Sequence, residues 1–262
     1  MVSSIRSAEL KLARAAKHLR AIKRCIATYS ASQPHKVIAK AKGKRKVNVP
    51  KSPPQAISVL AGEMVYQLRS ALDHLTFEVI KSNPNVATID PDWRDHCQFP
   101  LRTKIPKGRT PPLAKNEFFR SLPGISDKAF AIIERMQPYY STSAVNNALR
   151  FLAHLSNIDK HRHLNLIRPR VRQRQYIRFG SGLATGGWQM LDRGAIVDLP
   201  RRGSESDPPV YVNRRYRTLV SFNEREHLGD ATAVPVDHLL YLILYHIKVF
   251  VVPALHQLIK NP

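Results

Sequence analysis

The pattern that most constrains the fold is a long run of apolar side chains at helical spacing over residues 55–81. Its members recur at steps of three and four residues, which places them on one face of an α-helix. They are Ile57, Leu60, Met64, Leu68, Leu72, Leu75 and Val79. Asn83-Pro84 follows the run, and the helix ends there because a residue that precedes proline disfavours helical geometry. We predict one long helix that buries this stripe in a core.

Polar groups suited to proton transfer and phosphate chemistry interrupt this helix and a second one. Arg69, Asp73 and His74 lie in the first helix, and Arg69 and Asp73 are neighbours on one face because they are four residues apart. The second helix carries a denser cluster: Asn157, Asp159, Lys160, His161 and Arg162. Burying such groups without partners costs several kcal/mol. We therefore predict that the two helices meet, with Asp73 as the partner of Arg162.

Four further segments have the apolar periodicity of amphipathic helices. Their ranges are residues 3–29, 126–136, 146–163 and 236–259. Between residues 164 and 223, short apolar runs alternate with Gly, Pro, Asp and Ser turns, which is typical of a small antiparallel sheet. The predicted fold class is α+β. It consists mainly of a helical bundle of about five helices, with a small antiparallel β-sheet inserted before the C-terminal helix.

Within this predicted single structural domain, four stretches have different roles. Residues 1–54 supply a basic N-terminal helix and a Pro-bounded linker, and residues 55–163 supply the helical core. Residues 164–223 form a small basic β-lobe, and residues 224–262 contain the C-terminal helix that closes the bundle.

That C-terminal helix approaches the length of a membrane span. However, His246 and Lys248 lie in its middle, and a central lysine costs ~2.5–3.5 kcal/mol on insertion scales. A buried bundle helix is therefore favoured, with no membrane partner, and a membrane-associated basic protein is the less favoured alternative. The N-terminus has no apolar core of the kind found in signal peptides, so a cytoplasmic location is predicted.

We predict neither a cofactor nor a metal ion. The two cysteines, Cys25 and Cys97, do not form a CxxC pair. Several histidines lie close to Asp159 in the sequence of the second polar helix, but Lys160 and Arg162 would repel a cation there. The sequence has no HExxH motif, and none of the predicted helices contains a Glu-x-x-His pair of the kind that metal sites in helices use.

The formal charge of +23 is concentrated in two stretches. Residues 1–54 contain fourteen Lys and Arg against one acid, and residues 165–217 contain eleven Arg, no Lys and four acids. Such an excess favours a polyanionic partner because each neutralised phosphate releases counterions. Nucleic acid is the leading candidate, and an anionic membrane surface or a general solubility bias remain alternatives.

Two groups of basic residues are the candidate contacts for that partner. The first is Lys40, Lys42, Lys44, Arg45 and Lys46, and the second is Arg170, Arg172, Arg174 and Arg178. Aromatic residues are interleaved with the second group, among them Tyr176 and Trp188. This combination is typical of a surface on which single-stranded bases stack, although part of the aromatic set could instead point into a sheet core.

The Arg69-x4-His74 spacing, with the polar Ser70 directly after the arginine, resembles the signature of the HEPN superfamily, helical bacterial proteins that include metal-independent ribonucleases. The resemblance implies that Arg69 stabilises the scissile phosphate of RNA, that His74 takes part in proton transfer, and that two copies meet in a homodimer. The residues of the second cluster, Asn157 to Arg162, would then complete the site.

Four short segments together also resemble a widespread family of uncharacterised bacterial helical proteins. They are LRSALDHL at 68–75, Phe99-Pro100, Gln137-Pro138-Tyr139 and NIDKHR at 157–162. The second resemblance supports the helical fold. The charge pattern predicts a nucleic-acid-binding protein, with RNA preferred, and the HEPN resemblance adds metal-independent endoribonuclease activity as one candidate function. The alternative is a non-catalytic basic binding module in which Arg69, Asp73, Asp159 and Arg162 form a structural ion network.

Overall fold

The computed structural model describes most of the chain in ten segments. These are residues 5–32, 36–39, 44–48, 52–140, 144–161, 167–179, 182–191, 196–198, 210–222 and 234–260. The chain divides into two compact units. The first comprises Met1–Ile22, Val59–Asn165 and Asp237–Pro262, and the second comprises Lys23–Ser58 and Leu166–Val236.

The first unit is helical, as predicted, and its long elements follow the predicted ranges closely. They are α1 (Arg6–Ser32), α2 (Gln55–Lys81), α5 (Asp127–Arg135), α6 (Ala144–His161), α8 (Val236–His246) and α9 (Val252–Lys260). The end of α1, from Lys23 on, and the start of α2, up to Ser58, belong to the second unit. Between α2 and α5, the chain forms only α3 (Val86–Ile89), α4 (Trp93–His96) and the 3-10 helix η1 (Lys115–Phe118). The prediction of a helical bundle is confirmed.

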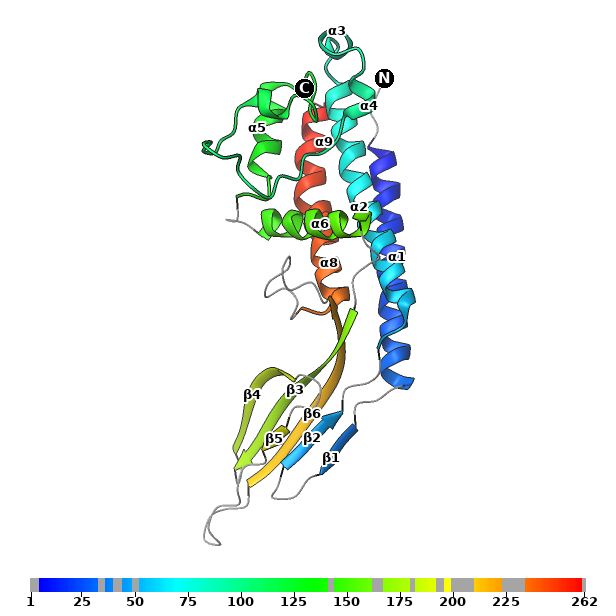
Figure 1. The fold of residues 1–262 in the computed structure, drawn as a ribbon, viewed down its shortest axis with the longest axis vertical. Coiled ribbons are helices and arrows are strands. Elements are labelled where there is room, and N and C mark those ends of the chain that lie inside the picture. Colours follow the sequence, from blue (N-terminus) through cyan, green and yellow to red (C-terminus); the bar gives the residue numbers. More distant parts are fainter. Residues whose placement is uncertain are drawn as a thin grey trace. The chain divides into compact units, whose positions relative to one another are not determined.

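Helices α1 and α2 run antiparallel and lie side by side in this unit (Figure 1). Near the start of α1, Ser7 Oγ lies 2.6 Å from His74 Nδ1. Further along α1, His18 Nδ1 lies 3.2 Å from Glu63 Oε2 of α2. Contacts that advance along one helix while they recede along the other define the antiparallel pairing.

Helix α2 is the centre of this core. The predicted stripe is buried, with Met64, Leu68 and Leu72 at 0% exposure, although Leu60 is only half-buried. Ala61 and Ala71, which lie outside the stripe, are also fully buried, because neighbouring elements pack on more than one side of α2. A helix that is apolar around most of its circumference is expected at the centre of a bundle.

The final helical segment is continuous from Val236 to Lys260 but changes its winding in the middle. A π-helical turn, η3 (Ile247–Val251), separates α8 from α9. Pro253 follows this turn and lacks the N–H that an α-helix would use there, which accounts for the local change in winding. By length and composition, the segment could cross a membrane: an 18-residue stretch of it has a mean hydropathy of 1.7. Of that stretch, 39% is buried inside the structure.

The second unit contains the strands. β3 (Ile167–Phe179) lies between β4 (Gly182–Leu191) and β6 (Val210–Phe222), and both neighbours pair with it in antiparallel fashion. A second sheet has the order β1 (Lys36–Ala39), β2 (Lys44–Asn48) and β5 (Ile196–Asp198). Two of these strands lie in the segment that we predicted to be a linker.

Candidate anion-binding pocket

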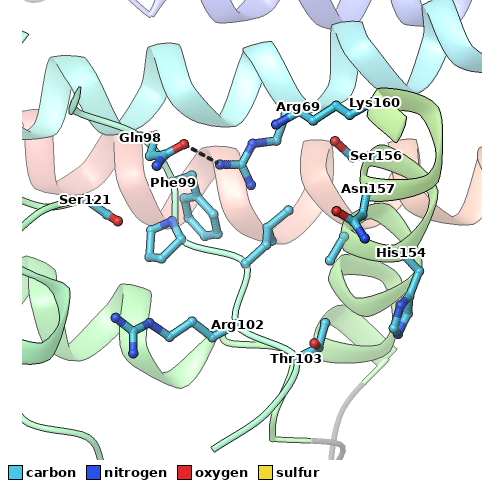
Figure 2. A pocket seen from close by; sticks show the side chains of 13 residues that line it. Arg69, Gln98, Phe99, Arg102, Thr103, Ser121, His154, Ser156, Asn157 and Lys160 are labelled. Atoms are coloured by element: carbon cyan, nitrogen blue, oxygen red, sulfur yellow. Dashed lines mark hydrogen bonds between the residues drawn. The ribbon is translucent and has the colours of Figure 1, made fainter. Parts of the chain in front are cut away.

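A pocket of about 400 Å³ lies in the helical unit between α2, α6 and the extended segment 98–103 (Figure 2). Its lining is rich in hydrogen-bonding and basic groups, and none of its thirteen lining residues in the described chain is acidic. They are Arg69, Gln98, Phe99, Pro100, Leu101, Arg102, Thr103, Ser121, Ala153, His154, Ser156, Asn157 and Lys160. This composition suits an anionic ligand with several oxygen acceptors.

Asp73 fastens the α2 side of the pocket to the extended segment. Its Oδ1 accepts a hydrogen bond from the Phe99 backbone N–H at 2.9 Å and lies 3.3 Å from Arg69 Nη2. The same Arg69 nitrogen donates to Gln98 Oε1 at 3.4 Å (Figure 2). Both contacts therefore hold one end of the guanidinium. Burial raises the pKa of Asp73, and the charges of Arg69 and Lys160 and the Phe99 N–H act against that rise.

Helix α6 supplies the opposite side. Asn157 and Lys160 are exposed at the rim, and His154 and Ser156 are half-buried. Arg69 from α2 and Lys160 from α6 both lie close enough to the Asp73 carboxylate to lower its pKa. The two polar helical segments that we predicted to meet therefore share one pocket.

The extended segment 98–103 is held in place from behind by the Gln137-Pro138-Tyr139 motif. The Gln137 side chain accepts from the Arg102 backbone N–H at 3.1 Å, and the Tyr139 N–H donates to the Arg102 carbonyl at 3.0 Å. Asn146 of α6 donates through Nδ2 to the carbonyl of Gln137 at 2.8 Å and to that of Arg135 at 3.0 Å. Backbone groups without regular secondary structure thus find partners in the segment that follows α5 and on α6.

A buried carboxylate, that of Glu134, binds the segments that support the extended segment 98–103. Glu134 is 2% exposed, and its Oε1 accepts from Tyr139 Oη at 2.7 Å, from Tyr140 Oη at 3.0 Å and from the Leu113 N–H at 3.0 Å. Burial, followed by the hydrogen bond to Glu134, raises the pKa of Tyr140 to about 12 and that of Tyr139 further. These tyrosines therefore act as hydrogen-bond donors at neutral pH.

Arg102 is the third basic residue of the pocket, and its position is already determined by other contacts. Its Nη2 donates to the Glu117 carbonyl, its Nη1 lies 4.0 Å from Glu117 Oε2, and its guanidinium carbon lies 4.2 Å from the centre of the Phe118 ring. The Glu117 carboxylate offsets part of its charge. Arg102 therefore contributes less free charge to the pocket than Lys160, which has no ion-pair partner within the described segments.

The Arg69/His74 pair does not converge on this pocket. Arg69 lines it, whereas His74 is hydrogen-bonded to Ser7 of α1. Residues five apart on a helix are about 140° apart around its axis, so their side chains leave α2 on different sides. The resemblance implied one site for both residues, and within a single chain the two lie at separate places.

The other predicted site residues fall into three groups. Asn157 and Lys160 line the pocket, and Asp73 lies directly behind it. Asp159 is half-buried away from the lining, and burial raises its pKa. His161 is the last residue of α6, and its side chain lies outside the described part of the structure. Arg162 lies outside the described residues, so its predicted pairing with Asp73 stays a prediction.

The predicted nucleic-acid contacts within the described residues lie on strands of the second unit. Lys44, Arg45 and Lys46 belong to β2, whereas Lys40 and Lys42 lie outside the described residues. The remaining four belong to β3: Arg170, Arg172, Arg174 and Arg178.

The sequence reasoning did not identify Gln98, Arg102 or Ser121 as site residues. They come from a Pro-rich stretch without periodicity, and its one usable signal was the Phe99-Pro100 pair. Among the described residues, no three His, Cys, Asp or Glu side chains are grouped as a metal ion would require. No protein-family model matches the chain, and neither a curated protein nor a solved structure does.

Proposed function

We propose that the protein binds nucleic acid, with RNA preferred, and that the pocket between α2 and α6 receives a phosphate group of the strand. The observation that carries the proposal is a pocket with Arg69, Arg102 and Lys160 in its lining and no acidic residue among its thirteen lining residues. The net charge of +23 supports the same class of partner, because counterion release rewards each phosphate that is neutralised.

Arg69 is the residue best prepared for such a contact. Asp73 and Gln98 already hold its guanidinium, so binding a phosphate costs little additional side-chain entropy. The guanidinium has five N–H donors, and the contacts to Asp73 and Gln98 occupy only part of them. Lys160 adds a mobile point charge from the opposite helix.

Strand binding is expected to depend on Lys160 and Arg69. Replacing either residue by glutamine removes one positive charge, and we expect about threefold to tenfold weaker binding of single-stranded RNA at moderate salt. The slope of log K against log salt should also fall by ~0.7 for each lost phosphate contact. Fluorescence anisotropy with a labelled RNA, measured over a series of salt concentrations, gives both quantities.

The matched control is Lys248→Gln, which removes the same charge from an exposed position on the C-terminal helical segment. It should reduce affinity much less than the pocket variants do. Equal losses in all three variants would mean that only net charge matters and would contradict a phosphate site at the pocket. Binding that does not change with salt would contradict the proposal as a whole.

The proposal extends to a second basic surface. A small antiparallel sheet, inserted over residues 164–223 before the C-terminal helix, would present Arg170, Arg172, Arg174 and Arg178 to the strand, and Lys44, Arg45 and Lys46 would add to it. The protein would act in the cytoplasm, without a cofactor, as a homodimer. Strands β2 and β3, to which these residues belong, support this surface.

A second candidate function is HEPN-like, metal-independent endoribonuclease activity. The position of Arg69 favours it, since this residue, which the resemblance assigns to the scissile phosphate, lies in the pocket. A 2′-hydroxyl can attack its own phosphate when a base removes its proton and a cation stabilises the developing charge. Because His74 faces α1, it could serve this pocket only from a second copy of the chain.

The nuclease is tested by incubating RNA with the purified protein in EDTA. We expect cleavage to fall by about 10²-fold or more in Arg69→Ala and in His74→Ala, since each would lose one part of the reaction. His238→Ala, at an exposed position on α8, is the control and should cleave like the wild type. If the wild type does not cleave RNA, the remaining alternative is a non-catalytic binding module in which Arg69 and Asp73 form a structural ion pair.

A further inference from the structure

We infer that the pocket takes a terminal phosphomonoester, from the end of a strand or from a free nucleotide, in preference to an internal phosphodiester. This inference rests on the proposed function and names the chemical group that the pocket recognises. Its basis is the supply of hydrogen-bond donors in the lining and the balance of charge.

The pocket is open to solvent, and firmly held elements form its sides. The pocket is bounded by α2, by α6 and by a wall whose Phe99 and Pro100 are buried and which Asp73 and the Gln137 side chain both anchor (Figure 2). Its volume of about 400 Å³ is at the lower end of the range for small-molecule sites.

The lining supplies several hydrogen-bond donors to an anionic ligand. Besides the Arg69 guanidinium and the Lys160 ammonium, the lining offers the hydroxyls of Thr103, Ser121 and Ser156. A phosphodiester has two free oxygens, whereas a phosphomonoester presents three strong acceptor oxygens. Since donors to an ionised acceptor form the stronger hydrogen bonds, the third oxygen favours the terminal group.

The charge balance favours the same group. Asp73 offsets Arg69 at 3.3 Å, and Glu117 offsets part of the Arg102 charge, but neither carboxylate lines the pocket. Lys160 at the rim forms no ion pair in the described part of the chain, although the Asp73 carboxylate is near enough to interact with its charge. A phosphomonoester carries roughly −1.5 to −2 charge at pH 7, against −1 for a phosphodiester. The additional charge is attracted to Lys160, so this residue should be the main source of discrimination.

The test compares RNA 12-mers of one sequence that differ only at their ends. One carries a 5′-phosphate, one a 3′-phosphate, and one has hydroxyls at both ends. The label is internal, and AMP and inorganic phosphate serve as unlabelled competitors. We expect one phosphorylated 12-mer to bind about tenfold more tightly than the unmodified one, and AMP to compete for the site. Which end is preferred, and whether AMP competes as well as the strand, identifies the source of the phosphate.

Lys160→Gln should remove this preference while the unmodified strand still binds, and Lys248→Gln should retain it. Circular dichroism checks that both variants are folded, which their exposed positions favour. Equal affinities for all three 12-mers would overturn the inference but leave the proposed nucleic-acid binding intact. A preference that survives both Lys160→Gln and Arg69→Gln would place the recognition outside this pocket and also overturn it. If no 12-mer binds, the proposed function and the inference are both wrong.

Discussion

Replacing Glu134 by alanine is expected to lower the free energy of unfolding by about 3–5 kcal/mol. The carboxylate is 2% exposed and accepts hydrogen bonds from three donors, the Tyr139 and Tyr140 hydroxyls and the Leu113 backbone N–H. The substitution leaves all three without their acceptor in a region that excludes water. Urea unfolding followed by circular dichroism measures the loss.

Two milder variants separate hydrogen bonding from charge. Glu134→Gln keeps one acceptor oxygen, and Tyr140→Phe removes one donor, so each should cost about 1–2 kcal/mol. A loss below 1 kcal/mol in Glu134→Ala would contradict the structural importance of this network.

The tyrosine titration provides an independent readout of the same network. The folded-state pKa of Tyr140 is raised to about 12 from an ordinary value of 10.0, so the unfolded chain ionises first as the pH rises. The contribution of this group to stability is therefore present below pH 10 and is lost as the pH rises through 12. Tyrosinate absorbance should show this late ionisation in the wild type and an earlier one in Glu134→Gln.

The helical part of the fold could be predicted because its signal is local. In α2, the apolar stripe and the Asn83-Pro84 stop give the bounds 55–81 that the structure has, and α6 is displaced by two residues from its predicted range. Periodic burial and chain-breaking residues act over one or two helical turns, so they can be recognised in a sequence without knowledge of the partner elements.

The pocket could be predicted only on its helical sides. The wall over residues 98–103 has no periodicity, and its position depends on hydrogen bonds to Asp73 and Gln137, which are 26 and 35 residues away from their partners in sequence. Such long-range contacts have no local signature. The Arg69-x4-His74 spacing was visible in the sequence, but only the packing of α1 against α2 decides that His74 turns toward Ser7 and not toward Arg69.

Gln137 links the stability of the fold to the shape of the pocket, and its replacement by alanine is expected to cost about 2–4 kcal/mol. The side chain is fully buried, accepts from the Arg102 N–H at 3.1 Å and donates to the Ile133 carbonyl at 3.0 Å. Alanine leaves both backbone groups without these partners and opens a cavity. Gln137→Met retains much of the volume, so the difference between the two variants measures the cavity contribution.

Gln137→Ala should also increase local opening of the pocket wall, residues 98–103. A variant that only lowers the stability of the whole unit would not increase this local opening. Hydrogen exchange of the Arg102 amide should accelerate in Gln137→Ala under native conditions, and RNA affinity should fall because Thr103 and its neighbours are no longer held opposite α6. The control is Leu255→Ala, at a fully buried position on α9 outside the pocket lining. It should lower stability by a similar amount while the Arg102 amide of the folded protein keeps its protection against local opening. If both variants changed that protection equally, the wall would depend on the stability of the whole unit, and the Gln137 hydrogen bond would not be what positions it.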